Sequence, residues 1–241
     1  MTRAIGRTLG EVAARNAAAI RVFEKYGLDY CCGGGKPFEE ACRERGLRPE
    51  QVEAEIEQAS AEPPAQERDW TEAPLGDLIA HILDRHHAYL REALPRITQM
   101  AAKVVEAHRA RHADTLIPLQ QTFAALREEL ESHMWKEEMV LFPLIRSMEE
   151  AAARGAGLPP SHCGSVNNPI RVMEHEHASA AQALEEMRRI TDGYAVPEDG
   201  CITYRAYFDE LRQLEQDLHR HIHLENNILF PRAADLEARL M

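Results

Sequence analysis

One phrase occurs twice in the 241-residue chain and constrains its fold more than any other feature. The stretch HMWKEEMVLFP at 133–143 returns 88 residues later as HIHLENNILFP at 221–231. Both copies place a histidine four residues before a glutamate and close on Leu-Phe-Pro. Because residues four apart lie on one face of a helix, each copy predicts a helix that presents an imidazole beside a carboxylate.

Four long helical patterns contain the repeat and its surroundings. They run over roughly 75–107, 115–153, 166–192 and 201–239, with no strand-like alternation, and glycines and prolines separate the last three. His87 precedes His133 by 46 residues and His177 precedes His221 by 44, so the two halves resemble a duplication. We therefore predict an all-α fold with a four-helix bundle over 75–241.

The apolar faces of these helices indicate which polar side chains point inward. Both copies of His-x-x-x-Glu fall within the apolar stripe of their helix, and so does His177 in the third pattern. His175, His219 and His223 face away from these stripes. Burying an ionised carboxylate is costly unless a partner compensates it, so two inward glutamates among several histidines predict bound cations.

The set of donor atoms favours two irons. Four histidines and two carboxylates are too many ligands for one closed tetrahedral zinc site. Imidazole nitrogens and bridging carboxylate oxygens suit a pair of irons that the glutamates and an oxo or hydroxo group span. We therefore favour a non-haem di-iron centre, while a single inward histidine on its own is more often a hydrogen-bonded core residue.

Several polar residues near these patterns keep two interpretations. Periodicity does not separate His86 from His87, because each continues an apolar stripe of the first pattern. Glu129 precedes His133 by four residues and Glu176 precedes His177, so both are candidates to support a ligand from outside, although Glu129 could equally be solvated. We expect solvated surface positions for His108, His112 and His162.

A smaller unit precedes the bundle. Residues 61–74 contain most of the proline-rich stretch SAEPPAQERDWTEAP and predict a linker between a helical domain over 1–60 and the bundle. Cys31 and Cys32 stand just before three glycines and a helix start at Pro37. A helix dipole there would lower the thiol pKa and make both cysteines candidates for redox or transfer chemistry. The alternative is a tight turn with two small buried residues.

Composition excludes some classes of partner and compartment. A formal net charge of -12 argues against binding to a phosphate backbone, so no nucleic acid is expected. The chain lacks an apolar run long enough for a membrane span and a recognisable secretion signal. Five cysteines without a spaced disulfide framework fit a reducing compartment, so we expect a cytoplasmic protein without membrane partners.

The motifs in combination resemble the repair-of-iron-centres family, the YtfE/ScdA-type di-iron proteins with a hemerythrin-like domain. The resemblance rests on YGLDYCCGGG, the dipeptide Asp69-Trp70, SHMWKEEMVLFP, VMEHEH and HIHLENNILFP, in this order over nearly the whole chain. It implies a cytoplasmic protein that restores iron-sulfur clusters damaged by nitric oxide or oxidants, with the adjacent cysteines as a redox or transfer element. It also implies the metal ligands, with the two glutamates bridging the irons: His87, His133, Glu137, His177, His221 and Glu225.

Three functions remain open from the sequence. The centre could supply iron to damaged iron-sulfur proteins or to a cluster scaffold, and this is the function that we favour. It could instead bind nitric oxide or oxygen and reduce nitric oxide, or it could act as a sensor of nitric oxide or redox state. The sequence leaves the oligomeric state open, with a homodimer among the alternatives.

Overall fold

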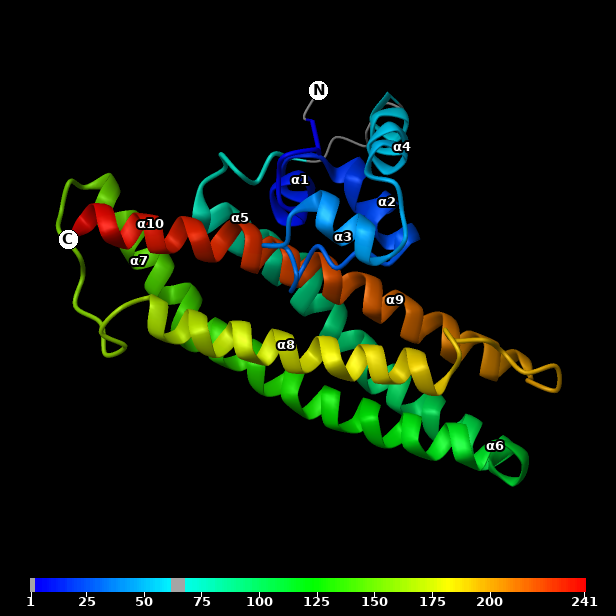
Figure 1. The fold of residues 1–241 in the computed structure, drawn as a ribbon. Coiled ribbons are helices and arrows are strands. Elements are labelled where there is room, and N and C mark those ends of the chain that lie inside the picture. Colours follow the sequence, from blue (N-terminus) through cyan, green and yellow to red (C-terminus); the bar gives the residue numbers. More distant parts are fainter. Residues whose placement is uncertain (1–2, 62–67) are drawn as a thin grey trace. The chain divides into compact units, whose positions relative to one another are not determined.

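The computed structural model describes residues 3–61 and 68–241, and its elements are helical throughout this part of the chain (Figure 1). The predicted all-α fold is confirmed. Residues 62–67 of the predicted linker lie outside the described residues. The chain folds into two compact units. The terminal unit comprises 1–80, 144–167 and 219–241, and the central unit comprises 81–143 and 168–218.

Four short helices form the first part of the terminal unit: α1 Leu9–Arg15, α2 Ala17–Tyr26, α3 Phe38–Glu44 and α4 Pro49–Ala61. Thr8 and Glu11 form a reciprocal capping box that fixes the start of α1. Asn16 caps α2, and Gly27 ends it in the left-handed region at φ 62°, which glycine adopts without strain. These helices enclose a small apolar core that includes Leu9, Val12, Phe23, Tyr30, Phe38 and Ile56.

The rest of the terminal unit contains α5 Leu75–His81, most of α7 Phe142–Ala153, η3 Glu225–Leu229 and α10 Phe230–Leu240. Glu149 accepts hydrogen bonds from the backbone N–H groups of Leu75 and Gly76, so a carboxylate from α7 caps the start of α5. Arg232 of α10 donates to the carbonyls of Trp70 and Ala73 and thereby fixes the last residues before α5.

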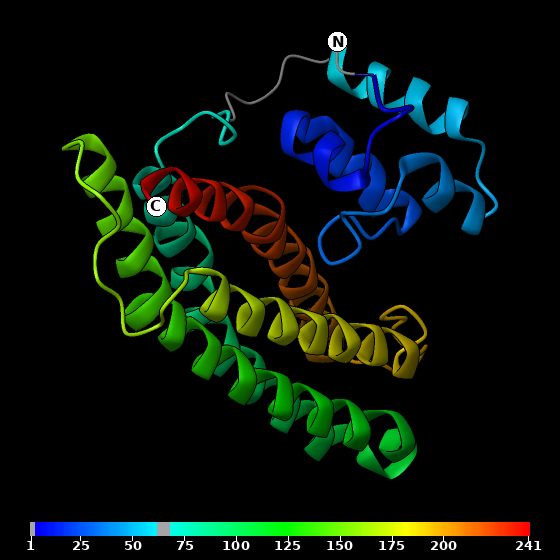
Figure 2. The ribbon, with the colours of Figure 1, turned by 60° about the vertical axis from the view of Figure 1, so that its left-hand side comes forward.

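The central unit is a four-helix bundle. Its helices are the two arms of α6 Ala88–Lys136, together with α8 Asn167–Ile190 and α9 Ile202–Leu224 over the parts that fall in this unit, and Figure 2 shows the arms of α6 in green. The core draws on all four helices and includes Leu90, Leu94, Ile97, Phe123, Leu126, Leu184, Phe208, Leu211 and Leu214.

The turn between the arms of α6 lies where the sequence predicted a break but is tighter than predicted. We expected a break over 108–114, but a single residue, His112, leaves helical geometry at φ -123° and ψ 25°. No glycine or proline occupies this stretch, so hydrogen bonding continues on both sides of one kinked residue. Arg127 in the second arm donates to Thr98 in the first at 3.0 Å, which ties the arms together.

Three π-helical segments interrupt the long helices, and each has a predicted ligand at its edge. η1 Ile82–His87 ends at His87, η2 Glu137–Leu141 begins at Glu137, and η3 begins at Glu225. Pro143 and Pro231 follow the last two segments in the repeated Leu-Phe-Pro. Proline cannot donate to the carbonyl four residues earlier and clashes with it, so widening of the preceding turn relieves a conflict that the repeat itself creates.

No described helix has the length and apolar character that crossing a membrane requires.

Candidate metal centre

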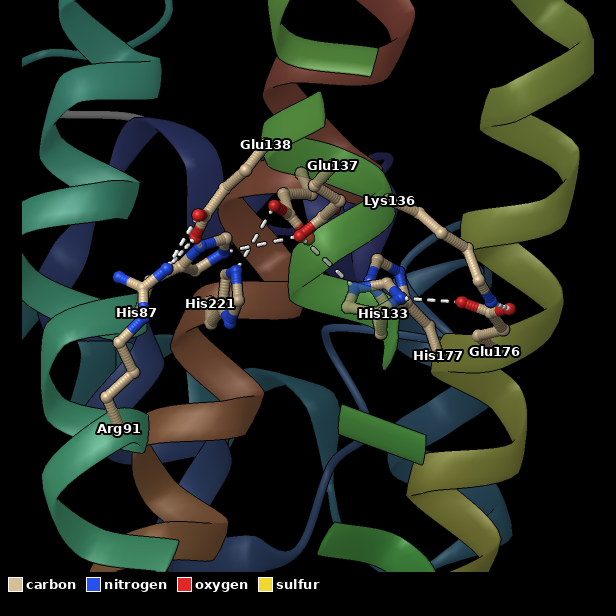
Figure 3. A network of polar contacts seen from close by, with 10 residues as sticks. His87, Arg91, His133, Lys136, Glu137, Glu138, Glu176, His177 and His221 are labelled. Atoms are coloured by element: carbon tan, nitrogen blue, oxygen red, sulfur yellow. Dashed lines mark hydrogen bonds and ion pairs between the residues drawn. The ribbon is translucent and has the colours of Figure 1, made fainter. Parts of the chain in front are cut away.

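Four buried side chains of metal-ligating type converge in the central unit (Figure 3). They are His87 at the end of η1, His133 in α6, Glu137 at the start of η2 and His177 in α8. Oε2 of Glu137 lies 3.3 Å from Nε2 of His87 and 3.4 Å from Nε2 of His133. Nε2 of His133 lies 3.2 Å from Nε2 of His177. One carboxylate, fully buried, is thus flanked by imidazole nitrogens on two helices.

A carboxylate holds the outer nitrogen of two of these histidines (Figure 3). Nδ1 of His87 lies 2.6 Å from Oε1 of Glu138, and Nδ1 of His133 lies 2.9 Å from Oε2 of Glu176. Arg91 donates to both oxygens of Glu138, and Lys136 donates to Glu176. These pairs link a buried histidine to a cation at the surface through one carboxylate.

The pKa values of the two outer carboxyls follow from these contacts. Burial alone would raise the pKa of Glu138 and of Glu176. Hydrogen bonds from a histidine and from a cation outweigh burial at each, so both pKa values lie below the ordinary value. Glu138 and Glu176 are therefore ionised near neutral pH and act as acceptors for Nδ1–H.

The arrangement around Glu137 fits a bound metal. An imidazole that donates its Nδ1–H to an outer carboxylate carries a lone pair on Nε2 when it is neutral. In His87 and His133 this lone pair faces an oxygen of Glu137, so two acceptors repel each other. A cation between the nitrogen and the oxygen would remove the repulsion, because both atoms would then be its ligands. One ligand atom each from His133, Glu137 and His177 lies within 4.8 Å of the others, so the donor set suits metal ions.

The second copy of the motif lies in the terminal unit. Nε2 of His221 is 3.1 Å from Oε1 of Glu225, four residues on at the start of η3, and their exposed fractions are 1% and 0%. Both side chains of this pair are therefore buried on one face of the helix, as the apolar stripe predicted.

The cysteine pair lies in a loop that one aspartate organises. Oδ1 of Asp29 accepts hydrogen bonds from the backbone N–H groups of Cys31 and Cys32 and from Sγ of Cys31. Cys31 is buried, and its pKa is raised well above the ordinary value by the hydrogen bond with Cys32, then by burial, with Asp29 adding to both. The predicted lowering of the Cys31 pKa is wrong, because α3 begins only at Phe38 and an acidic acceptor is nearer.

Asn227 of η3 holds this loop within the terminal unit. Its Nδ2 donates to the carbonyl of Tyr30 at 3.0 Å and contacts Nδ1 of His223 at the same distance. A Cβ added at Gly10 or Gly34 would lie 2.2 Å from its Oδ1, so both positions require glycine in this packing. Asn226 adds a longer contact of 3.4 Å to the carbonyl of Cys31.

The other histidines and the glutamate singled out in the sequence differ in burial. His86 is buried and lies 3.0 Å from Asp217, on a contact separate from that of His87. Glu129 is exposed and accepts a hydrogen bond from Ser179. His223 was predicted to face away from the apolar stripe that contains His221. It is nevertheless buried, and desolvation lowers its pKa to about 4. His162 and His175 are exposed, whereas His108, His112 and His219 are half-buried.

Comparison with known proteins connects this geometry to a family. Residues 78–233 match the model of the hemerythrin HHE cation binding domain, and residues 5–60 match a domain of unknown function, DUF542. The iron-sulfur cluster repair protein YtfE of Pectobacterium atrosepticum is 40% identical over 94% of this chain and 96% of its own. The proteins of the same name from Musicola paradisiaca and Escherichia coli O157:H7 are each 39% identical, over 96% and 93% of this chain and 98% and 95% of their own. The chain belongs to this family of iron-sulfur cluster repair proteins.

In this member of the iron-sulfur cluster repair family, sequence reasoning missed Glu138, which contacts His87, and Asn227, which holds the cysteine loop. Glu138 directly follows Glu137, and its signal was the second acidic residue in the phrase HMWKEEMVLFP. Asn227 was indicated only by the departure of the second copy from the first, in which Met139 occupies the equivalent position. Neither residue continues an apolar stripe, which is why periodicity passed over both.

Proposed function

We propose that the chain is a non-haem di-iron protein that repairs iron-sulfur clusters damaged by nitrosative or oxidative stress, by supplying iron. The observation that carries the proposal is the fully buried carboxylate of Glu137 between imidazole nitrogens of His87 and His133. The name shared by the relatives supports the repair function.

The proposed centre uses both copies of the repeated motif. We assign as its ligands, with the glutamates bridging the two irons, His87, His133, Glu137, His177, His221 and Glu225. Support comes from the burial of all six side chains and from the preference of iron for mixed imidazole and carboxylate donors.

The residues of the chain explain how such a centre could release iron. When bound, the two irons would provide ferrous iron for transfer to a damaged cluster and would allow one-electron redox chemistry. Two carboxylates and neutral imidazoles neutralise only part of the charge of two ferrous ions, so the protein holds them without a fully compensating anionic cage. Glu176 holds Nδ1 of His133 and leaves Nε2 to the metal, which is the supporting role that we propose for it.

Other parts of the chain complete the proposal. The domain division is 1–60, the linker 61–74 and the bundle 75–241, which the ranges of the two family matches support. The partners are damaged iron-sulfur proteins or a cluster scaffold, with Cys31 and Cys32 as candidates for redox or transfer steps. Cytoplasmic action is supported by five cysteines in the described part among which no disulfide forms.

Iron content tests the centre. Anaerobically purified wild type is compared with the Glu137→Ala/Glu225→Ala double variant and with Glu131→Ala, which removes an exposed carboxylate whose partner is Arg127. We expect about two irons per chain in wild type and in Glu131→Ala, and a loss of both in the double variant. Iron that persists in the double variant would contradict the ligand assignment.

Transfer to a client tests the function. Iron-loaded protein is mixed anaerobically with an apo iron-sulfur protein, and cluster formation is followed by its visible absorption. Reconstitution faster than with the same concentration of free ferrous iron is expected. Equal rates, together with sustained formation of labelled nitrous oxide from labelled nitric oxide, would replace iron supply by nitric oxide reduction.

A further inference from the structure

We propose that Glu138 is a positioning residue for the metal centre, which holds His87 in the tautomer that presents Nε2 to the metal, and that Arg91 holds Glu138 in place. The inference deepens the proposed function and rests on the proposed ligation by His87. It assigns a role to the second carboxylate of the Glu137-Glu138 pair.

Two neighbouring carboxylates reach opposite nitrogens of one ring. Oε1 of Glu138 lies 2.6 Å from Nδ1 of His87, and Oε2 of Glu137 lies 3.3 Å from Nε2 of the same ring (Figure 3). Arg91 donates to both oxygens of Glu138, so this carboxylate is placed as an acceptor, and the short contact assigns the ring proton of His87 to Nδ1. Nε2 is then the nitrogen whose lone pair points toward Oε2 of Glu137 and would bind a metal placed between them.

The ring of His87 is fixed from a third side. It stacks on Phe142 with a centroid distance of 5.8 Å and an interplanar angle of 29°, and its exposed fraction is 0%. Phe142 is the phenylalanine of the repeated Leu-Phe-Pro, directly after η2. Ring plane and proton position are thus both set by η2 and the residue that follows it.

Arg91 connects this contact to the surface. It stands four residues after His87, so it lies on the same face of the helix and donates to both oxygens of Glu138. The side chains of Glu138 and Arg91 are 26% and 54% exposed, and both line a cavity of about 350 Å³ beside Trp135 and Glu131. Solvent therefore reaches Glu138 and Arg91, whereas His87 is sealed.

The second copy of the repeat has no carboxylate at the position of Glu138. In the register that aligns the two Leu-Phe-Pro endings, Asn226 occupies the position of Glu138. Its amide donates to the carbonyl of Cys31 at 3.4 Å. The carboxylate at 138 is therefore a property of the first copy and not a by-product of the repeated motif.

The first test reads the proton on His87 in metal-free protein. Imidazole ¹⁵N chemical shifts are recorded at pH 8 for wild type, Glu138→Gln, Glu138→Ala and the control Glu131→Gln, which lines the same cavity. We expect the Nδ1–H form of His87 in wild type, in the control and in Glu138→Gln, whose amide oxygen still accepts. In Glu138→Ala we expect a mixture of tautomers. An unchanged spectrum of His87 in Glu138→Ala would overturn the proposal.

The second test measures loss of iron to a ferrous chelator. Release should be about 10- to 100-fold faster in Glu138→Ala than in wild type, in line with the usual effect of removing a carboxylate that holds a ligand histidine. Glu138→Gln and Arg91→Ala should lie between them, and Glu131→Gln should match wild type. Equal release from Glu138→Ala and Glu131→Gln would refute the positioning role.

The outcome of these tests can be distinguished from a failure of the proposed function. If wild type held no iron, the di-iron proposal would fall, while the tautomer of His87 in metal-free protein would still decide whether Glu138 positions the ring. Thermal unfolding of each metal-free variant identifies any that is misfolded. If Glu138→Ala is misfolded, the decisive variant is Glu138→Gln, which keeps the size and shape of the side chain. Its iron should then be released faster than that of wild type.

Discussion

Replacement of Asn227 by alanine should loosen the loop that carries Cys31 and Cys32. The amide of Asn227 fills a space between Gly10 and Gly34 and donates to the carbonyl of Tyr30, a residue with 2% exposure. It also contacts Nδ1 of His223 at 3.0 Å. The variant removes the shared donor and leaves a buried carbonyl without it.

The magnitude follows from the burial of that carbonyl. Loss of a hydrogen-bond partner by a buried group costs about 1–3 kcal/mol, with the lower end applying if water enters the space vacated by the amide. If the loop opens locally, this cost corresponds to roughly 5- to 150-fold faster exchange of its backbone N–H groups.

Hydrogen exchange measured by mass spectrometry on peptides covering 28–36 is the appropriate assay, with urea unfolding for global stability. Asn226→Ala is the matched control, because its amide lies 3.4 Å from the carbonyl of Cys31 and makes the weaker contact. We expect a clear acceleration over 28–36 in Asn227→Ala and a smaller one in the control. Equal exchange in Asn227→Ala and wild type would refute the assignment of Asn227 as the residue that holds the loop.

Two further predictions concern titration. Cys201 is exposed, and its pKa is lowered to about 7 by a hydrogen bond with His108 and by backbone N–H groups at the start of α9. Mass mapping should therefore find it the first cysteine alkylated at pH 7, and His108→Ala should move the midpoint of its alkylation rate to higher pH. His223 has a pKa lowered to about 4 by burial, against 6.5 as the ordinary value, so the unfolded chain binds the extra proton first as pH falls. The free energy of unfolding should then decline between pH 6.5 and 4 by up to about 3 kcal/mol, and His223→Gln should reduce this slope in urea titrations.

The helical class and most helix positions could be predicted because apolar periodicity is a local property. The patterns 166–192 and 201–239 lie close to α8 and to α9 through α10. The turn at His112 lies inside the break that the patterns left over 108–114, but its tightness could not be predicted, since one residue leaves helical geometry without glycine or proline. The division of the chain into two units also depends on contacts between distant segments, which no local pattern records.

At the candidate site, the choice between His86 and His87 shows where periodicity fails. A helical wheel assumes a constant turn per residue, but η1 is π-helical up to His87 and advances by a smaller angle per residue. Both histidines are buried, one against Asp217 and the other against Glu137 and Glu138. Likewise, the pKa of Cys31 depends on Asp29 and Cys32 in a folded loop, so the nearby helix start was a poor guide.

The fluorescence of Trp135, one of two tryptophans in the chain, should report on the metal centre. Trp135 is 62% exposed and stands midway between His133 and Glu137, so its backbone is about 3 Å along the helix axis from either residue. An iron bound to those side chains is expected to quench the emission of this indole by energy transfer. Occupancy and loss of metal can therefore be followed continuously in the unlabelled protein, with Trp70→Phe leaving this single emitter.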